Sequence, residues 1–576
     1  MTRTLLTACL TGSTLWCFPA LADLPPVLDR VPTGASVIVA IANVSETHGG
    51  IKRYADRFGV EDAAVQLAML EAMLTSEGMN AAGSAAFVMV DPETTYMLLP
   101  VSDFNALIAG LGGEAADGFG QADVMGEMAF FRDLGGGFAA AGPDDGILRG
   151  LPATSGTMDA HTKRLGKTGK AVAEQSDMVV IADVQALRPQ IEEGVNGMRQ
   201  QMEFMAMMGG QGEQIGQAMG LIDALSVAIT RDGRVALMGV DFAEEGMRLE
   251  FAAQFEEDSP SAAFFTAPGN SGSILARLPN VPYILAYAVD FSSPGLRKGL
   301  SEMMNLAAQA DPEAIGLVGV NPFQFLDSMD GSGMVLGHTP ALLTGGLMAN
   351  TVAYTKTTDP AGMVGAMKQA FANMDGKAAD GVMYKTAYTD GAGEAAGTKY
   401  DAWSMTMSID FNAPNAMEAQ QVQQGMMLMF GPTGGPSGFL AATEGGLVQT
   451  MSRNSQLLTK AIESAKSGNG LGAEKGIASV AEHLPAGRSF EAYVGVQRVM
   501  ESVGSMMAMM GGFPMPRVEG ELPPIGVAAT THDAGLRATV YLPNKVMDVF
   551  KQLGDAFGGE DDMMDAPPAG GQRPRF

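Results

Sequence analysis

Cysteine is nearly absent from this chain, because only Cys9 and Cys17 occur among its 576 residues. Both lie in the first 22 residues, where Arg3 is followed by an apolar stretch and then by a small-residue cleavage point at Ala22-Asp23. This arrangement is typical of a secretory signal peptide, so we expect a periplasmic or extracellular mature chain that contains no cysteine. Disulfides, thiolate metal sites and thiol nucleophiles are therefore excluded from the mature chain.

Positive charge and histidine are also scarce. The 36 Lys and Arg residues face 64 Asp and Glu residues, which gives a formal net charge of −28. Such a surface repels nucleic acid and anionic lipid headgroups, so we exclude nucleic acid as a partner. The five histidines are scattered, without the i,i+4 pair or the His-Glu-x-x-His helix that zinc sites use. We therefore expect no cofactor and no metal.

Long apolar runs are missing after the signal segment. Residues 331–355 and 419–443 carry no charge, but glycine interrupts the first stretch and glutamine and proline interrupt the second. A membrane-spanning helix requires about 20 predominantly apolar residues. We therefore expect no transmembrane segment in the mature chain.

What the chain does contain is a long-range repeat. The hexapeptide Met-Ala-Met-Met-Gly-Gly begins at Met205 and begins again at Met507. Three other landmarks recur in the same order: Gly137-Phe138 with Gly438-Phe439, Val172-Ala173-Glu174 with Val480-Ala481-Glu482, and the turn at Gly233 with the turn at Gly535. Recurrence in the same order predicts a duplicated architecture.

Short local units also recur. A Leu-Pro or Val-Pro pair ends a helical or turn segment at Pro32, Pro279 and Pro485, and each pair precedes a run rich in β-branched or aromatic residues. Asp103 and Asp359 each follow a predicted strand and precede a predicted helix, so they are expected to be N-caps rather than catalytic carboxylates.

Glycine-containing turns predict hairpins in both halves. The runs 224–230, 234–242 and 247–255 are separated by such turns, and so are 525–531 and 536–542.

Together these patterns predict an α+β fold of two related halves, each with antiparallel sheet meanders and helices packed on one face. The expected organisation is a signal peptide at 1–22, a first half at 23–266, a second half at 273–550 with an insertion around 375–430, and a disordered acidic tail at 551–576.

The order of these units resembles a family of secreted bacterial proteins known only as a domain of unknown function. The similarity rests on the Leu-Pro, strand and helix unit, the strand, Asp and helix unit, and the glycine-turn hairpins. It covers most of residues 24–545. The resemblance implies an envelope or extracellular location and supplies no catalytic residues.

Methionine is abundant, with 43 residues in the chain. Two clusters stand out: Met202, Met205, Met207 and Met208, and then Met506, Met507, Met509 and Met510. Methionine fills cores and lines adaptable apolar surfaces, so these clusters are our candidate surface for an apolar ligand or a partner. Thioethers also bind copper(I), which leaves a copper-handling protein as an alternative.

Motifs for common enzyme classes are incomplete. Gly166-Lys167-Thr168 has His161 where a phosphate-binding loop needs its first glycine, and Ser437 has Phe439 where a nucleophile elbow needs its second. We therefore predict a non-enzymatic secreted or periplasmic envelope protein with a binding or structural role. An envelope enzyme with a site assembled from distant residues remains the alternative from another class.

Overall fold

The computed structural model describes residues 23–59, 68, 71–72, 74–124, 126–151, 155–209, 226–310, 322–339, 345–379, 382–409, 423, 425–509, 518 and 520–557. These residues form an α+β fold with extensive antiparallel pairing, in two compact units. The first unit holds strands β1 to β9 and most of β10, and the second holds β11 to β21. The predicted α+β fold class is thus confirmed.

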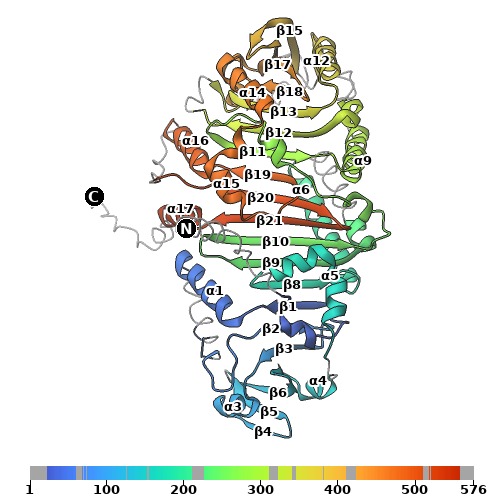
Figure 1. The fold of residues 1–576 in the computed structure, drawn as a ribbon, viewed down its shortest axis with the longest axis vertical. Helices are drawn as coiled ribbons and strands as arrows, with labels where there is room; N and C mark the ends of the chain where they lie inside the picture. Colours follow the sequence, from blue (N-terminus) through green and yellow to red (C-terminus); the bar gives the residue numbers. More distant parts are fainter. Residues whose placement is uncertain are drawn as a thin grey trace, which may run out of the picture. The chain divides into compact units, whose positions relative to one another are not determined.

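The first half is built on one meandering antiparallel sheet. Its described strands are β1 (Val37–Ile41), β2 (Ala85–Met89), β3 (Thr95–Pro100), β4 (Glu114–Ala116), β5 (Phe119–Val124), β6 (Glu127–Gly135), β7 (Phe138–Gly142), β8 (Met178–Asp183), β9 (Gly233–Phe242) and β10 (Gly246–Phe255). Hydrogen bonding orders them β10-β9-β8-β1-β2-β3-β7-β6-β5-β4. Every neighbouring strand pair from β9 to β4 is antiparallel. Strands β9, β8, β1, β2 and β3 lie one after another in Figure 1.

The second half repeats this order. Its described strands are β11 (Tyr283–Asp290), β12 (Met329–Gly337), β13 (Asn350–Thr357), β14 (Ala378–Ala379), β15 (Val382–Ala395), β16 (Thr398–Ile409), β17 (Ser437–Thr443), β18 (Gly446–Thr450), β19 (Arg488–Val494), β20 (Ile525–His532) and β21 (Gly535–Pro543). They are ordered β21-β20-β19-β11-β12-β13-β18-β17-β16-β15-β14. Apart from the additional β14, each strand takes the place of one strand of the first half.

Helices occupy matching places in the two chain orders. The first half has η1 (Pro26–Arg30), α1 (Val44–Phe58), α3 (Phe104–Gly110), α4 (Asp145–Gly150), α5 (Met158–Glu174) and α6 (Arg188–Gly209). The second half has α8 (Gly272–Leu275), α9 (Pro294–Ala310), α12 (Pro360–Met374), α14 (Ser455–Ser467), α15 (Lys475–Ala481), α16 (Val496–Met509) and α17 (Asn544–Phe557). Helix α17 follows the last strand of the second half, whereas the described residues 256–261 after β10 form no helix.

The main core of the first half lies on one face of its sheet. Successive side chains of a strand point to opposite faces, and Ile38 and Ala40 of β1 are fully buried beneath η1, α4 and α5. Leu28, Leu148 and Val172 are among the fully buried residues that these helices contribute.

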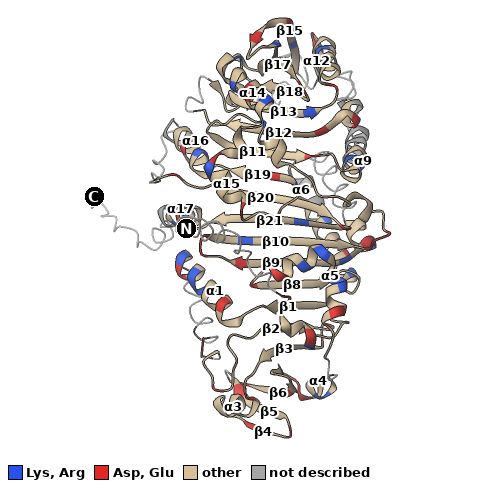
Figure 2. Cartoon of the chain, viewed as in Figure 1, with Lys and Arg blue, Asp and Glu red and all other residues tan. Residues whose placement is uncertain are grey.

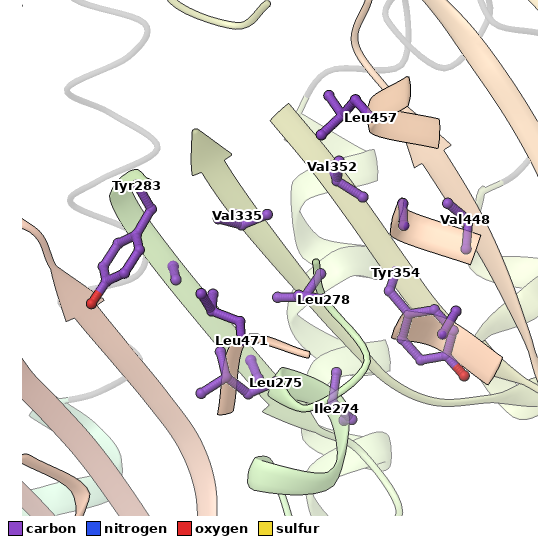
Figure 3. Packing of buried hydrophobic residues seen from close by; sticks show 14 of the residues in the cluster. Ile274, Leu275, Leu278, Tyr283, Val335, Val352, Tyr354, Val448, Leu457 and Leu471 are labelled. Atoms are coloured by element: carbon purple, nitrogen blue, oxygen red, sulfur yellow. The ribbon is translucent and has the colours of Figure 1, made fainter. Parts of the chain in front are cut away.

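The second half has an equivalent core on the equivalent face. Helices α8, α14 and α15 pack on Ala286 and Ala288 of β11 and on Val335 of β12. Figure 3 shows Ile274 and Leu275 of α8 beside these strands. The helical layer predicted on one face is therefore present in both halves.

One further helix in each half packs on the opposite face, at the far end of the sheet. In the first half, Phe104 and Leu107 of α3 contact the cluster that includes Leu99 of β3 and Ala139 of β7. In the second half, Phe371 of α12 packs in the same manner with its own cluster. Each sheet is thus covered on both faces at its far end.

Several local predictions hold. Strands β1, β11 and β19 follow the three proline-terminated units. Asp103 accepts a hydrogen bond from the Ala106 backbone N–H, and Asp359 accepts one from Gly362, so both are N-caps.

Other predictions were wrong. Residues 226–232 are helical, not a strand, and Thr230 Oγ1 donates to the Ser226 carbonyl 2.8 Å away, one helical turn earlier. Two repeat landmarks were also misaligned. Strand β7, which follows Gly137, corresponds in order to β18, whereas Gly438 lies in β17. Gly233 opens β9, which corresponds to β20, whereas Gly535 opens β21.

Among the described helices, none is long and apolar enough to cross a membrane. The predicted signal peptide at 1–22 lies outside the described residues, and so does most of the predicted tail at 551–576.

Candidate functional site

The strands of the first half present a second apolar surface on the face opposite the main core. In β1 the buried residues Ile38 and Ala40 alternate with Val37, Val39 and Ile41, which point to the other side. The same alternation holds in the four neighbouring strands. We use "apolar face" for the fifteen residues Ala236, Met238, Val240, Met178, Val180, Ala182, Val37, Val39, Ile41, Ala85, Phe87, Met89, Thr95, Met97 and Leu99.

The apolar face is a regular grid with almost no polar atoms. Direct antiparallel partners place Met238, Val180, Val39, Phe87 and Met97 in one row across five strands. Thr95 is the one polar side chain of the fifteen, and none of the fifteen carries a charge. Neighbouring strands lie about 4.8 Å apart, so the row spans about 19 Å.

Large side chains on this row are exposed to solvent. Phe87, Met97 and Met238 are each 42% exposed. Phe251 of β10 is 45% exposed and points to the same side, since its neighbour Ala252 joins the main core. Figure 2 shows little charge along β1 and β2, while blue segments mark α1 and α5. A contiguous apolar surface of this kind is typical of a ligand or partner site.

Described helices reach the edges of the apolar face. Val44 of α1 packs with Ile41 and Ala85 at one corner. The α3 cluster includes Leu99 of β3 and Ala141 of β7, and Ala141 is the partner of Met97. The exposed row lies between these two contacts.

The second half carries the equivalent grid. We use "counterpart face" for Ile525, Val527, Ala529, Phe490, Ala492, Val494, Leu285, Tyr287, Val289, Ser332, Met334, Leu336, Thr351, Ala353 and Thr355. Every one of these residues is buried or half-buried. At one end of the grid, Val494 and Ile525 pack against Val496 and Met500 of α16 and against Val546 of α17. This end of the counterpart face is therefore covered by helices of its own half.

The predicted methionine clusters lie on the helices that follow β8 and β19. Met202, Met205, Met207 and Met208 fall on α6, and their side chains lie outside the described part. Met506 and Met507 are half-buried on α16, Met509 is the last residue of that helix, and Met510 lies outside the described residues. The methionine surface therefore stays a prediction.

One grouping of serine, histidine and glutamate occurs in the second half. His338 Nδ1 lies 3.2 Å from Ser502 Oγ, and His338 Nε2 lies 3.5 Å from Glu501 Oε2. A serine nucleophile must give its proton to the imidazole. Ser502 Oγ instead donates to the Arg498 carbonyl 2.8 Å away, so it accepts from His338, and it is 8% exposed. Burial lowers the pKa of His338, with Glu501 opposing the shift. This geometry ties α16 to the sheet and does not fit nucleophilic catalysis.

A buried carboxylate organises the start of the second half. Glu491 is 1% exposed; its Oε1 accepts from Ser271 Oγ at 3.0 Å and its Oε2 accepts from the Tyr493 hydroxyl at 2.9 Å. Arg488 Nε lies 3.0 Å from Oε2 and supplies the opposite charge. Burial, followed by the nearby Glu491 charge, raises the pKa of Tyr493. With every oxygen occupied and no solvent access, this group serves stability.

Metal binding by the usual ligands finds no support within the described ranges, where no group of three or more His, Cys, Asp or Glu side chains is placed to hold an ion. The apolar face was the feature that sequence reasoning missed. Its signal was present, because the run from Val37 to Ile41 is apolar at every position, which indicates a strand with two buried or contacting faces.

Comparisons with protein-family models, with curated proteins and with solved structures found no match for this chain.

Proposed function

We propose that this chain is a non-enzymatic envelope protein, exported to the periplasm or beyond, whose role is to bind an apolar ligand or an apolar segment of a partner on the apolar face of its first half. The proposal rests on the exposed row that contains Phe87, Met97 and Met238, each of which is 42% exposed to solvent. Apolar area left in water costs about 25 cal/mol per Å². Covering this row with an apolar occupant therefore releases a substantial free energy.

The chemistry of the apolar face favours an occupant without polar requirements. Strands β8, β1, β2 and β3 each have a hydrogen-bonded neighbour on both sides, so their backbone groups are already paired. No charged side chain belongs to the fifteen residues. Recognition must then come from shape and burial rather than from directed hydrogen bonds. Methionine suits this role because its thioether side chain is flexible and polarizable.

Binding of a neutral, environment-sensitive dye such as Nile red tests the proposal. Replacing Met97 or Met238 by Gln keeps side-chain length and removes the apolar contact. Each change is expected to weaken binding by about 1.4 kcal/mol, which is tenfold in the dissociation constant. The measurement is a fluorescence titration of the purified protein.

Met128→Gln provides the matched control. Met128 is 53% exposed on β6, outside the apolar face, so this variant should bind the dye like the parent protein. Equal loss of affinity in all three variants, or no loss in Met97→Gln and Met238→Gln, would contradict the proposed site. Unchanged circular dichroism must accompany each result.

Export is the second part of the proposal, and it rests on the sequence of residues 1–22. The mass of the protein recovered from an envelope fraction tests it: cleavage at Ala22-Asp23 yields a chain that begins at Asp23. A chain that retains Met1 in the cytoplasmic fraction would contradict export.

A further inference from the structure

The two halves differ at one place that identifies what the apolar face accepts. In the second half, α17 begins at Asn544, directly after β21, and returns to the sheet. In the first half, β10 takes the place of β21, and residues 256–261 after it form turns that lead to a short 3₁₀ helix at Ala262–Phe264. The first half therefore has no described helix in the position of α17.

Helix α17 shows how a helix fits this type of surface. Val546 and Val549 are buried, and Leu553 is partly buried in the same cluster. Their spacing of three and four residues places them on one side of the helix. That side packs with Val494 and Ile525, which belong to the counterpart face.

The exposed row on the first half has matching chemistry. Val494 and Ile525 occupy the grid positions that Ala182 and Ala236 occupy in the first half. The row beside them carries Met238 and Val180 and continues to Phe87 and Met97. Its span of about 19 Å corresponds to about 13 residues of α-helix, and α17 has 14 residues.

We propose, on the basis of the binding role proposed above, that the occupant of the apolar face is an amphipathic α-helix of a partner protein. Its apolar residues repeat with the spacing of Val546, Val549 and Leu553. The partner helix packs on the apolar face of the first half in the way that α17 packs on the counterpart face of the second half. This mode of recognition lays one apolar helix face on a hydrophobic surface, so it needs no free strand edge. The chain's net charge of −28 further favours a helix whose outer side is basic.

A helix-stabilised synthetic peptide with the sequence of residues 544–557 is the probe. Cross-linking on its polar side keeps it helical, because free peptides of this length are marginal helices in water. Fluorescence anisotropy with the purified protein is expected to show saturable binding. Met97→Gln and Met238→Gln in the protein should each weaken binding about tenfold, and Met128→Gln should leave it unchanged.

A second peptide with Asp at the positions of Val546 and Val549 is the matched control on the ligand side. It should lose binding, because it places two charges against a surface without polar partners. The helix proposal would be overturned if the first peptide did not bind, or if Met97→Gln and Met238→Gln left its affinity unchanged. An unchanged affinity in these variants would indicate that the peptide displaces α17 from the second half.

The dye titration distinguishes a wrong occupant of the apolar face from a wrong binding site. Dye binding that depends on Met97 and Met238, together with no peptide binding, would overturn the helix and leave an apolar small molecule as the occupant. Failure of both dye and peptide to respond to these substitutions would overturn the site itself.

Discussion

Glu491 shows how a single buried charge constrains its neighbourhood. Its two oxygens are engaged by Ser271 and Tyr493, and Arg488 balances its charge. Arg488 also donates to the backbone carbonyls of Ala481 and Pro485, which fixes the end of α15. The group therefore connects a helix, a strand and the segment before α8.

Removal of Arg488 is expected to be strongly destabilising. Arg488→Ala leaves the Glu491 carboxylate buried without its counter-charge, which costs about 3–5 kcal/mol of unfolding free energy. Arg498→Ala is the control, since Arg498 and Glu501 form an ion pair at 2.7 Å that is 39% exposed on each side and is worth less than about 1 kcal/mol. Urea denaturation measures both variants, and equal losses would contradict the assigned role of burial.

His161 is expected to make stability depend on pH. It is 2% exposed, its Nε2 donates to the Val31 carbonyl at 2.9 Å, and burial lowers its pKa below the ordinary value of 6.5. In the unfolded chain this histidine takes up a proton near pH 6.5, whereas in the folded chain it remains neutral to lower pH. Folding stability is therefore full above pH 6.5 and decreases as the pH falls below it.

His161→Gln tests this link because glutamine keeps a donor for Val31 and does not titrate. The difference in Tm between pH 7.5 and pH 5.5 should be smaller in this variant than in the parent. His532→Gln is the control, as His532 is a half-exposed residue beside Asp533. A pH dependence that is the same in the parent and in His161→Gln would contradict the assignment.

At the scale of elements, helix α17 acts as a cover for the counterpart face. Val549 is 5% exposed within the cluster formed by α16 and α17, whereas the next residue, Phe550, is 43% exposed. The two residues thus point to opposite environments on one helix. A substitution at Val549 therefore tests the packing of α17, whereas the same substitution at Phe550 tests only its helix propensity.

Val549→Ser is expected to loosen α17 locally. The change removes buried apolar contacts and adds a buried hydroxyl, at a cost of about 2 kcal/mol. Hydrogen exchange should accelerate in residues 544–557, and Nile red binding should gain a component that Met97→Gln does not remove. Phe550→Ser should produce neither effect, and identical behaviour of the two variants would contradict the role of α17 as a cover.

Individual elements were predicted well where local signals were strong. Proline-terminated units located β1, β11 and β19, and the capping residues Asp103 and Asp359 located the starts of α3 and α12. The predicted strand at 224–230 failed because its alternating apolar residues fit a strand, while the structure places its described residues 226–230 in a helix that precedes β9. Periodicity over seven residues does not separate these two outcomes.

At the scale of the whole molecule, the sequence predicted two related halves, and the strand orders agree with that prediction. Two of the four landmarks behind it were misaligned by one strand, since glycine occurs at several hairpin turns and does not identify which turn it marks. The candidate site was less predictable. The apolar face is contributed by five strands that are distant in sequence, so only the sheet register brings Met97 and Met238 into one row.

The outermost strands of the two sheets have a consequence for self-association. Strand β4 has 3 residues, so the far end of the first sheet offers little edge for another chain to extend. In the second sheet, β14 has 2 residues and pairs with only two residues of the 14-residue β15. Unpaired strand edges are the usual templates for fibre growth, and proteins commonly shorten them. The first sheet can therefore keep a broad apolar surface without inviting end-to-end polymerisation through β4.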